Sequence, residues 1–225
     1  MREESPQVSV MAVVHRHQPL PADPYELWLR DELGDLLGIP HDGTRVEIVG
    51  GEIVVSPGPD FAHNLIVSDL QDAFAAAKAV GQAAGWRCVQ TQDVNLSEIH
   101  EGYIPDLCVM SEADVQKARS RRSSKILPDE LTLAVEVTSR SNFAEDREPG
   151  ARRQRPSKWN GYARTGIPYY LIVDRDPQVM TSTLFTEPGF GGRYEESTSW
   201  KFGESIQLPA PFGITVPTDE WEAWD

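Results

Sequence analysis

Short runs in which hydrophobic and polar residues alternate recur along the chain, a pattern typical of β-strands. Residues 44–58, TRVEIVGGEIVVSPG, predict a hairpin of two β-rich runs joined at Gly50-Gly51, a favoured two-residue turn. Four further runs predict strands, at 86–96, 103–110, 131–141 and 169–174. From Val179 onward, TSTLFTE and GRYEESTSW predict a second hairpin.

Three other stretches carry helix signals, two of them as apolar residues at helical spacing. Leu27, Leu29 and Leu33 predict a helix over 24–33, and the stretch after Asp60 carries an apolar stripe that begins at Ile66. A third, short helix runs through KWNGYART, and Gly166 and Pro168 can end it. The basic segment QKARSRRSSK predicts a loop or a frayed helix, and residues 139–155 predict an arginine-rich loop.

From Asp60 to Asp174 the predicted order is therefore helix, three strands, helix, strand, which indicates an α/β core with a mixed central sheet. An N-terminal helix and hairpin precede this core, and a C-terminal β-hairpin follows it. We expect residues 1–24 to be a flexible segment, residues 25–217 to form a single domain, and residues 218–225 to be a polar tail.

Two carboxylates interrupt predicted strands. In LTLAVEVTS, Glu136 shares a face with Thr132, Ala134 and Thr138, and in IPDLCVM, Asp106 precedes an alternating run. If the two strands pair, the carboxylates converge on one point, where they repel unless one is protonated or a cation lies between them. Hard oxygen ligands in small number suit Mg²⁺ or Mn²⁺. The simpler alternatives are that Asp106 bends a strand after Pro105 and that Glu136 pairs with an arginine.

Lys158 opens the helix that follows, and Tyr162 lies one turn later on the same face. A lysine beside such a metal site can orient the attacking water and offset charge that develops on phosphorus. The alternative is a solvated lysine on a short helix.

Composition adds a local basic region to this picture. The 225 residues carry a net charge of −14, but residues 116–165 hold 12 of the 21 Lys and Arg and only six acids, so this window is +6 and the remainder −20. A local basic surface can bind a polyanion because screening limits the reach of each charge to about 10 Å. The predicted nucleic-acid contacts are Arg121, Arg122, Arg152, Arg153 and Arg155. The alternative is a pair of solvated basic loops.

Other features of the sequence bear on the cellular compartment in which the protein is expected. The sequence has no apolar run long enough to span a membrane, and MREESPQ lacks the order of a signal peptide. The two cysteines, Cys88 and Cys108, form neither a disulfide framework nor a zinc site by themselves. We therefore expect a cytoplasmic protein with buried free thiols.

Taken in order, four stretches resemble the Uma-type restriction endonuclease family, within the PD-(D/E)XK (restriction-endonuclease-like) nuclease superfamily. They are RVEIVGGEIVVSPGPDFAHN, GYIPDLCVM, LAVEVTSRS and KWNGYARTGIPYYLIVD. The resemblance implies an αβββαβ core with Asp106 and Glu136 as metal ligands. The superfamily's lysine two residues after the glutamate is replaced here by Thr138, and Lys158, in a K-x-x-x-Y frame, matches the family's alternative position.

The resemblance also implies that Glu47 orients water near the metal and that His63 contacts substrate. An arginine-rich insertion, EPGARRQRPS, separates Asp146-Arg147 from the lysine, so either Lys158 or a neighbouring arginine fills the catalytic cation position. The leading hypothesis is a Mg²⁺- or Mn²⁺-dependent endonuclease that hydrolyses DNA phosphodiester bonds, most simply as a homodimer. The alternative is a catalytically weak or inactive nuclease fold that acts as a nucleic-acid-binding or regulatory module.

Overall fold

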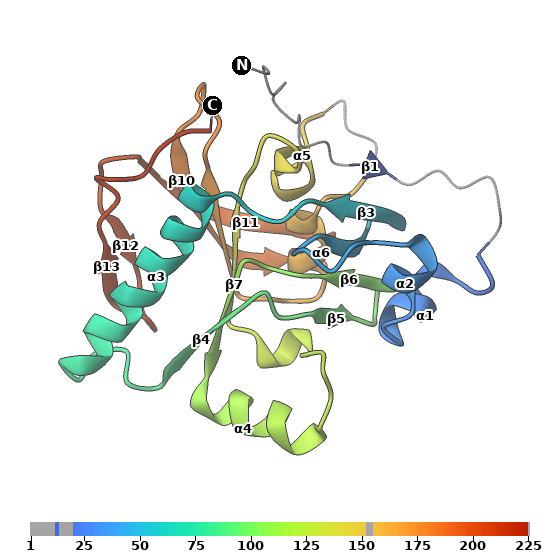
Figure 1. Cartoon of the computed structure of the whole chain (residues 1–225). Coiled ribbons are helices and arrows are strands. Elements are labelled where there is room, and N and C mark those ends of the chain that lie inside the picture. The colour runs from blue at the N-terminus through green and yellow to red at the C-terminus, as the bar shows by residue number, and fades with distance from the viewer. Residues whose placement is uncertain (1–11, 14–19, 152–154, 225) are drawn as a thin grey trace.

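The computed structural model describes residues 12–13, 20–151 and 155–224 (Figure 1). Its centre is a six-stranded sheet in the order β11-β10-β9-β8-β7-β4. The strands are β4 (Trp86–Gln90), β7 (Leu107–Ser111), β8 (Leu133–Val137), β9 (Tyr169–Asp174), β10 (Thr181–Gly189) and β11 (Arg193–Lys201). β8 and β9 run parallel and the other neighbours antiparallel, which confirms the predicted mixed sheet.

Helix α3 (Phe61–Ala79) covers one face of this sheet. It begins where predicted, because the Asp60 side chain accepts a hydrogen bond from the His63 amide at 2.7 Å. The odd-numbered residues of β7 and β8 pack beneath it. Figure 1 shows α3 beside the small hairpin of β12 (Ile206–Leu208) and β13 (Ile214–Val216), which completes this layer.

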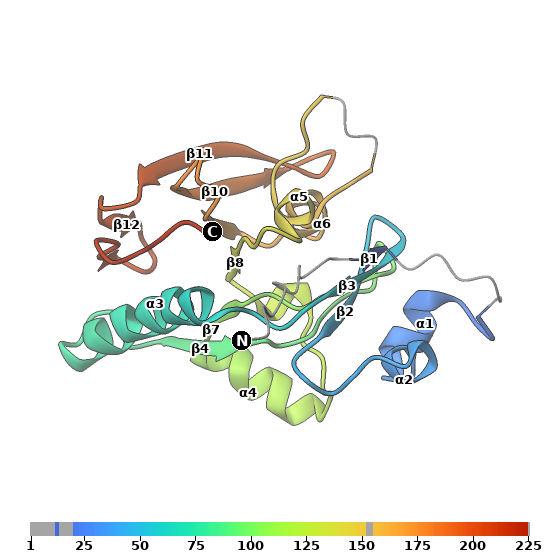
Figure 2. The ribbon, with the colours of Figure 1, turned by 45° about the horizontal axis from the view of Figure 1, so that its top comes forward.

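The opposite face is covered by helix α6 (Lys158–Arg164) and by a second, five-stranded sheet. That sheet has the order β1-β3-β2-β6-β5. Its strands are β1 (Ala12–Val13), β2 (Arg45–Val49), β3 (Glu52–Ser56), β5 (Val94–Leu96) and β6 (Glu101–Tyr103). Cys108, Met110 and Ala134 of the large sheet share a core with Trp159 and Tyr162 of α6. Figure 2 shows the two sheets packed side by side.

Two of the predicted strands are each divided between the two sheets. Residues 86–96 form β4 and β5, with Thr91 in the left-handed region at φ 47° between them. Residues 103–110 leave β6 after Tyr103 and enter β7 at Leu107, since Pro105 has no amide to pair. Asp106 therefore lies at the point where the chain crosses from one sheet to the other.

The shorter helices differ from their predictions. The helix expected over 24–33 is two helices, α1 (Pro24–Leu29) and α2 (Leu33–Leu37), because Asp31 adopts a left-handed conformation at φ 60°. The basic segment predicted as a loop or frayed helix lies largely in α4 (Glu112–Arg121), which is followed by the 3₁₀ helix η1 (Pro128–Glu130). A further short helix, α5 (Phe143–Asp146), interrupts the predicted arginine-rich loop.

The C-terminal segment packs against the body of the protein. Thr218 and Trp221 are buried, and the Trp221 indole donates a hydrogen bond to Asp69 on α3 at 2.9 Å. Both cysteines are free, Cys108 buried and Cys88 half-buried. Among the described residues, no helix combines the length and the apolar character needed to cross a membrane.

Candidate functional site

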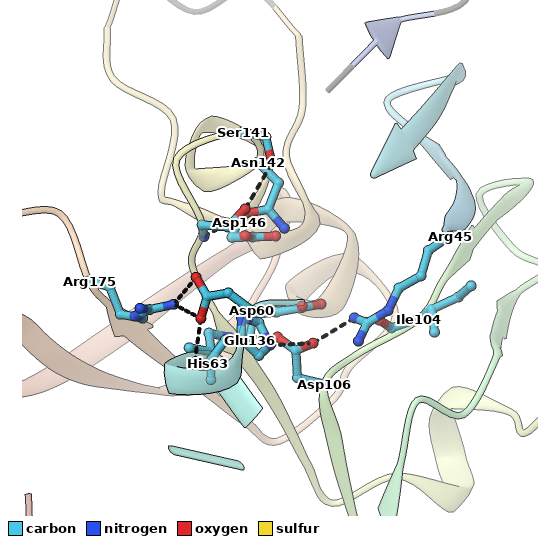
Figure 3. A network of polar contacts seen from close by, with 12 residues as sticks. Arg45, Asp60, His63, Ile104, Asp106, Glu136, Ser141, Asn142, Asp146 and Arg175 are labelled. Carbon is cyan, nitrogen blue, oxygen red and sulfur yellow. Dashed lines mark hydrogen bonds and ion pairs between the residues drawn. The ribbon is translucent and has the colours of Figure 1, made fainter. Parts of the chain in front are cut away.

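Asp106 and Glu136 lie opposite one another at the junction of β7 and β8. The register pairs Leu107 with Val135, and the Val137 amide donates to Asp106 Oδ2 at 2.8 Å. Directly opposed residues in an antiparallel pair place their side chains on one face. The exposed fractions of Asp106 and Glu136 are only 2% and 1%, and Figure 3 shows the two side chains next to each other.

Asp106 is held by two further groups that come from distant parts of the chain. Arg45 of β2 donates to Asp106 Oδ1 at 2.5 Å, and His63 Nε2, from the first turn of α3, lies 3.0 Å from the same oxygen. Burial alone would raise the pKa of Asp106, but His63 and Arg45 hold that pKa well below its ordinary value. Asp106 is therefore an ionised carboxylate at neutral pH.

Glu136 is bound through only one of its oxygens. Its Oε1 accepts hydrogen bonds from the Tyr162 hydroxyl at 2.6 Å and from Lys158 Nζ at 3.1 Å. Its Oε2 is buried and has no hydrogen-bond partner among the described residues. Burial raises the pKa of Glu136 well above its ordinary value, and the nearby carboxylates of Asp146 and Asp106 add to that rise while Lys158 opposes it.

Lys158 lies among three carboxylates. Its Nζ is 2.9 Å from Glu47 Oε1, 3.1 Å from Glu136 Oε1 and 3.4 Å from Asp146 Oδ1. The ammonium therefore lies within ion-pair distance of all three carboxylates, and it donates a hydrogen bond to Glu136 Oε1. Glu47 is fixed in turn by the Ile104 amide, which donates to its Oε1 at 2.7 Å. The ammonium therefore orients acids of this site rather than facing solvent.

Asp146, on α5, is the most weakly bound of these acids. It is fully buried, and neither of its carboxylate oxygens has a hydrogen-bond partner within the described part of the chain. Burial raises the pKa of Asp146 to about 7, although Lys158 opposes the rise. The site therefore gathers four buried acids around Lys158, Arg45 and His63, and burial favours the protonated form of two of these acids, Glu136 and Asp146.

This donor set fits a divalent cation held by two carboxylates. The described residues contain no group of three or more His, Cys, Asp or Glu side chains arranged as a metal cage. Mg²⁺, however, is commonly bound by one or two carboxylates with water in the remaining positions. Glu136 offers the unpartnered Oε2, and Asp106 Oδ2, which accepts one hydrogen bond from the Val137 amide, retains acceptor capacity.

Two of the arginines predicted to contact nucleic acid, Arg121 and Arg155, form ion pairs with acids of the protein instead. Arg121 donates to Glu130 Oε2 at 2.5 Å, and Arg155 binds Glu145 at 2.6 Å and also Glu52. Arg122 is exposed at the end of α4, which lies at the bottom of both overall views while α5 lies at the top (Figures 1 and 2). Arg152 and Arg153 fall outside the described residues. A DNA-binding role for this set stays a prediction.

Arg121 and its neighbour Arg122 give a test of the structural role. Glu130 is fully buried, so Arg121→Met leaves a buried carboxylate without its cation and should lower the free energy of unfolding by about 3 kcal/mol. Arg122→Met should change it by less than about 0.5 kcal/mol, as exposed positions usually do. Urea denaturation of the two variants measures the difference. Equal stability of both would contradict the assigned role of Arg121.

Two residues of the site escaped the sequence reasoning. Arg45 shares a strand face with Glu47 by the period of two, which is the signal that could have placed it at the site. Asp146 was visible only as the acid before Arg147. Glu47, His63, Asp106, Glu136 and Lys158, the candidates for catalysis, are all buried and lie in one connected network.

Comparisons with known proteins bear on the family and the fold of this chain. The sequence model of the Uma2 family, described as "Putative restriction endonuclease", matches residues 31–219. A crystal structure from Anabaena variabilis, described as a "putative nuclease belonging to DUF820", superposes with a TM-score of 0.56 at 13% identity, over 83% of this chain and 94% of that one. No curated protein matches the chain. The structural likeness shows a fold shared with that protein.

Proposed function

The chain belongs to the Uma2 family, and on that basis we propose that it is a metal-dependent endonuclease that hydrolyses DNA phosphodiester bonds. The observation that carries the proposal is the buried, face-to-face pair of Asp106 and Glu136, in which Glu136 Oε2 lacks a partner. Arg45 and Lys158 pair with the two carboxylates, but no donor among the described residues reaches Glu136 Oε2. A bound cation would give that oxygen a partner.

Asp106 and Glu136 would hold Mg²⁺ or Mn²⁺. When bound, the cation would act as a Lewis acid that polarises the phosphate and offsets charge developing on it. Arg45 and His63 keep Asp106 ionised and fixed in place. Lys158 and Tyr162 hold Glu136 Oε1, so that Oε2 remains for the ligand.

Asp146 is the acid best suited to accept a proton from the attacking water. Its pKa of about 7 lies near neutral pH, where a general base is most effective. Neither of its oxygens has a hydrogen-bond partner among the described residues, but Oδ1 lies 3.4 Å from Lys158 Nζ, so Oδ2 would receive the proton. Glu47, whose Oε1 is bound by Ile104 N and lies close to Lys158, would instead position the lysine.

A second candidate is a nuclease fold that binds nucleic acid without cutting it. The ion pair of Asp106 with Arg45 favours this reading, because it already balances one carboxylate of the pair. Thr138 in place of the superfamily's lysine favours it too: the Thr138 hydroxyl accepts a bond from the Arg175 amide at 3.0 Å and contacts Asp174, and so has a structural role.

One assay separates the two candidates. Supercoiled and linear DNA are incubated with the protein at low salt in Mg²⁺, in Mn²⁺ and in EDTA. With either cation the endonuclease should nick or linearise supercoiled DNA and shorten linear DNA, and in EDTA it should leave both intact. DNA that is bound in a gel-shift assay but stays intact in all three conditions would establish the second candidate instead.

We also propose that the protein acts in the cytoplasm as a homodimer. Cutting both strands of a duplex favours two sites related by a twofold axis. Light scattering after size-exclusion chromatography measures the mass in solution, and a monomer would remove this part of the proposal.

A further inference from the structure

Arg175, just after β9, brings two segments of the site together. Its backbone amide donates to Thr138 Oγ1 at 3.0 Å, directly after β8. Its guanidinium lies 3.0 Å from both oxygens of Asp60, the N-cap residue of α3. Figure 3 shows Arg175 bound to Asp60, with Asp146 and the loop residue Ser141 nearby. The start of α3 and the loop after Glu136 therefore meet beside the buried acids.

The start of α3 presents an uncovered apolar surface at this junction. Phe61 is 77% exposed, and Leu65, one turn later, is 46% exposed. Residues four apart lie together on a helix surface, so the two form one patch. The same turn directs His63 inward to Asp106. The patch therefore lies on the outer side of the turn that supplies a site residue.

The loop after β8 presents a cation. Arg140 is exposed and forms no ion pair with another described residue. This distinguishes it from Arg121, Arg147 and Arg155, which are all bound to acids. Arg140 lies two residues beyond Thr138, and the side chains of Ser139 and Asn142 brace the turn around it at 2.9 Å.

We propose that Phe61 and Arg140 form the surface that receives the substrate, and that this substrate is DNA with unpaired bases at the scissile position. The inference rests on the proposed function. Arg140 binds a phosphate, and Phe61, with Leu65 beside it, stacks on a base. Bases in an intact duplex hide their faces in the helical stack, whereas an unpaired base offers its face to an aromatic ring. The surface therefore favours a single strand, a flap or an opened end over intact duplex.

Binding can be measured without hydrolysis. Fluorescence anisotropy in EDTA compares a labelled 20-nucleotide oligodeoxythymidine with a 20-base-pair duplex. Wild type should bind the single strand more tightly. Phe61→Ala should weaken single-strand binding about tenfold and change duplex binding less than twofold, while Phe61→Trp should keep it. Phe190→Ala is the matched control, because Phe190 is equally available, at 107% exposed, on the turn between β10 and β11.

Arg140→Ala tests the phosphate contact through salt. For the single strand, the slope of log K against log salt concentration should fall by about 0.7, as for the loss of one phosphate contact. Lys201→Ala, an exposed cation at the end of β11, should leave the slope unchanged. An equal effect of the two variants would mean that binding follows the overall charge and would overturn the proposal.

The outcomes separate this inference from the proposed function. Equal losses of single-strand affinity in Phe61→Ala and Phe190→Ala, or tighter binding of duplex than of single strand by wild type, contradict the proposed surface even if metal-dependent cleavage is found. A loss of single-strand affinity in Phe61→Ala alone, without any cleavage by wild type, supports the surface and contradicts the proposed endonuclease activity. Cleavage of a single strand that is about tenfold slower at subsaturating substrate in Phe61→Ala supports both.

Discussion

Replacing Lys158 with methionine is expected to lower the free energy of unfolding by about 3–5 kcal/mol. Methionine keeps the length and apolar stem of the side chain but removes the ammonium. Glu47, Glu136 and Asp146, which lie 2.9–3.4 Å from that ammonium, would then be left buried without it. A buried charge that loses its partner costs far more than an exposed ion pair contributes.

The cost should depend on pH. Loss of the cation raises the pKa of Asp146 further above about 7, and an acid with a raised pKa in the folded state destabilises the protein at pH values above it. The destabilisation by Lys158→Met should therefore be largest near pH 8 and should shrink toward pH 5, where the acids take up protons. Urea denaturation at three pH values measures this.

Lys78 offers the matched control for Lys158. Its Nζ lies 3.3 Å from Glu112, and both side chains are well exposed. Lys78→Met should cost less than about 1 kcal/mol and show little dependence on pH between 5 and 8. A pH-independent loss of stability in Lys158→Met would mean that lost packing, rather than buried carboxylates left without their cation, causes it.

The faces of the central strands could be predicted because side chains alternate along a strand whatever it packs against. Leu107 and Val109 face α3, while Cys108 and Met110 face α6, as the period of two requires. The points where the chain crosses between the sheets, near Thr91 and Pro105, could not be predicted. Packing between segments distant in sequence decides where a strand changes partners, and the alternation of side chains continues unchanged across each crossing.

The contacts within the site also divide into those that the local sequence pattern predicts and those that depend on tertiary packing. Asp106 and Glu136 could be placed together because Asp106 directly precedes β7, Glu136 lies on β8, and both strands alternate clearly and pair. The Arg45 contact to Asp106 spans 61 residues, and no local pattern specifies it. The burial of Asp146 depends on α5 packing against β9, where the Tyr170 hydroxyl donates to the Asp146 carbonyl at 2.8 Å. In both cases tertiary packing supplies what the sequence pattern lacks.

Glu136→Gln is expected to reduce metal-dependent DNA cleavage at least about 10²–10³-fold, because a Lewis-acid cation supplies several kcal/mol of transition-state stabilisation. The amide is nearly isosteric, and its oxygen can still accept from Lys158 and Tyr162. The position of Oε2, which has no partner among the described residues, becomes an NH₂ group that cannot bind a cation. The cation site is thereby lost with little change in shape.

The same variant should be no less stable than wild type, in contrast to Lys158→Met. The pKa of Glu136 is raised by burial, so its ionised form costs stability at pH 8, and a neutral side chain removes that cost.

A cation that binds the folded state raises the melting temperature. Millimolar Mn²⁺ should therefore stabilise wild type in a thermal scan and leave Glu136→Gln unchanged. The control is Glu101→Gln, since Glu101 is a buried acid bound to Tyr103 outside the site. This variant should keep both metal-dependent cleavage and the stabilisation by Mn²⁺. An equal Mn²⁺ shift in wild type and Glu136→Gln would show that the cation binds elsewhere.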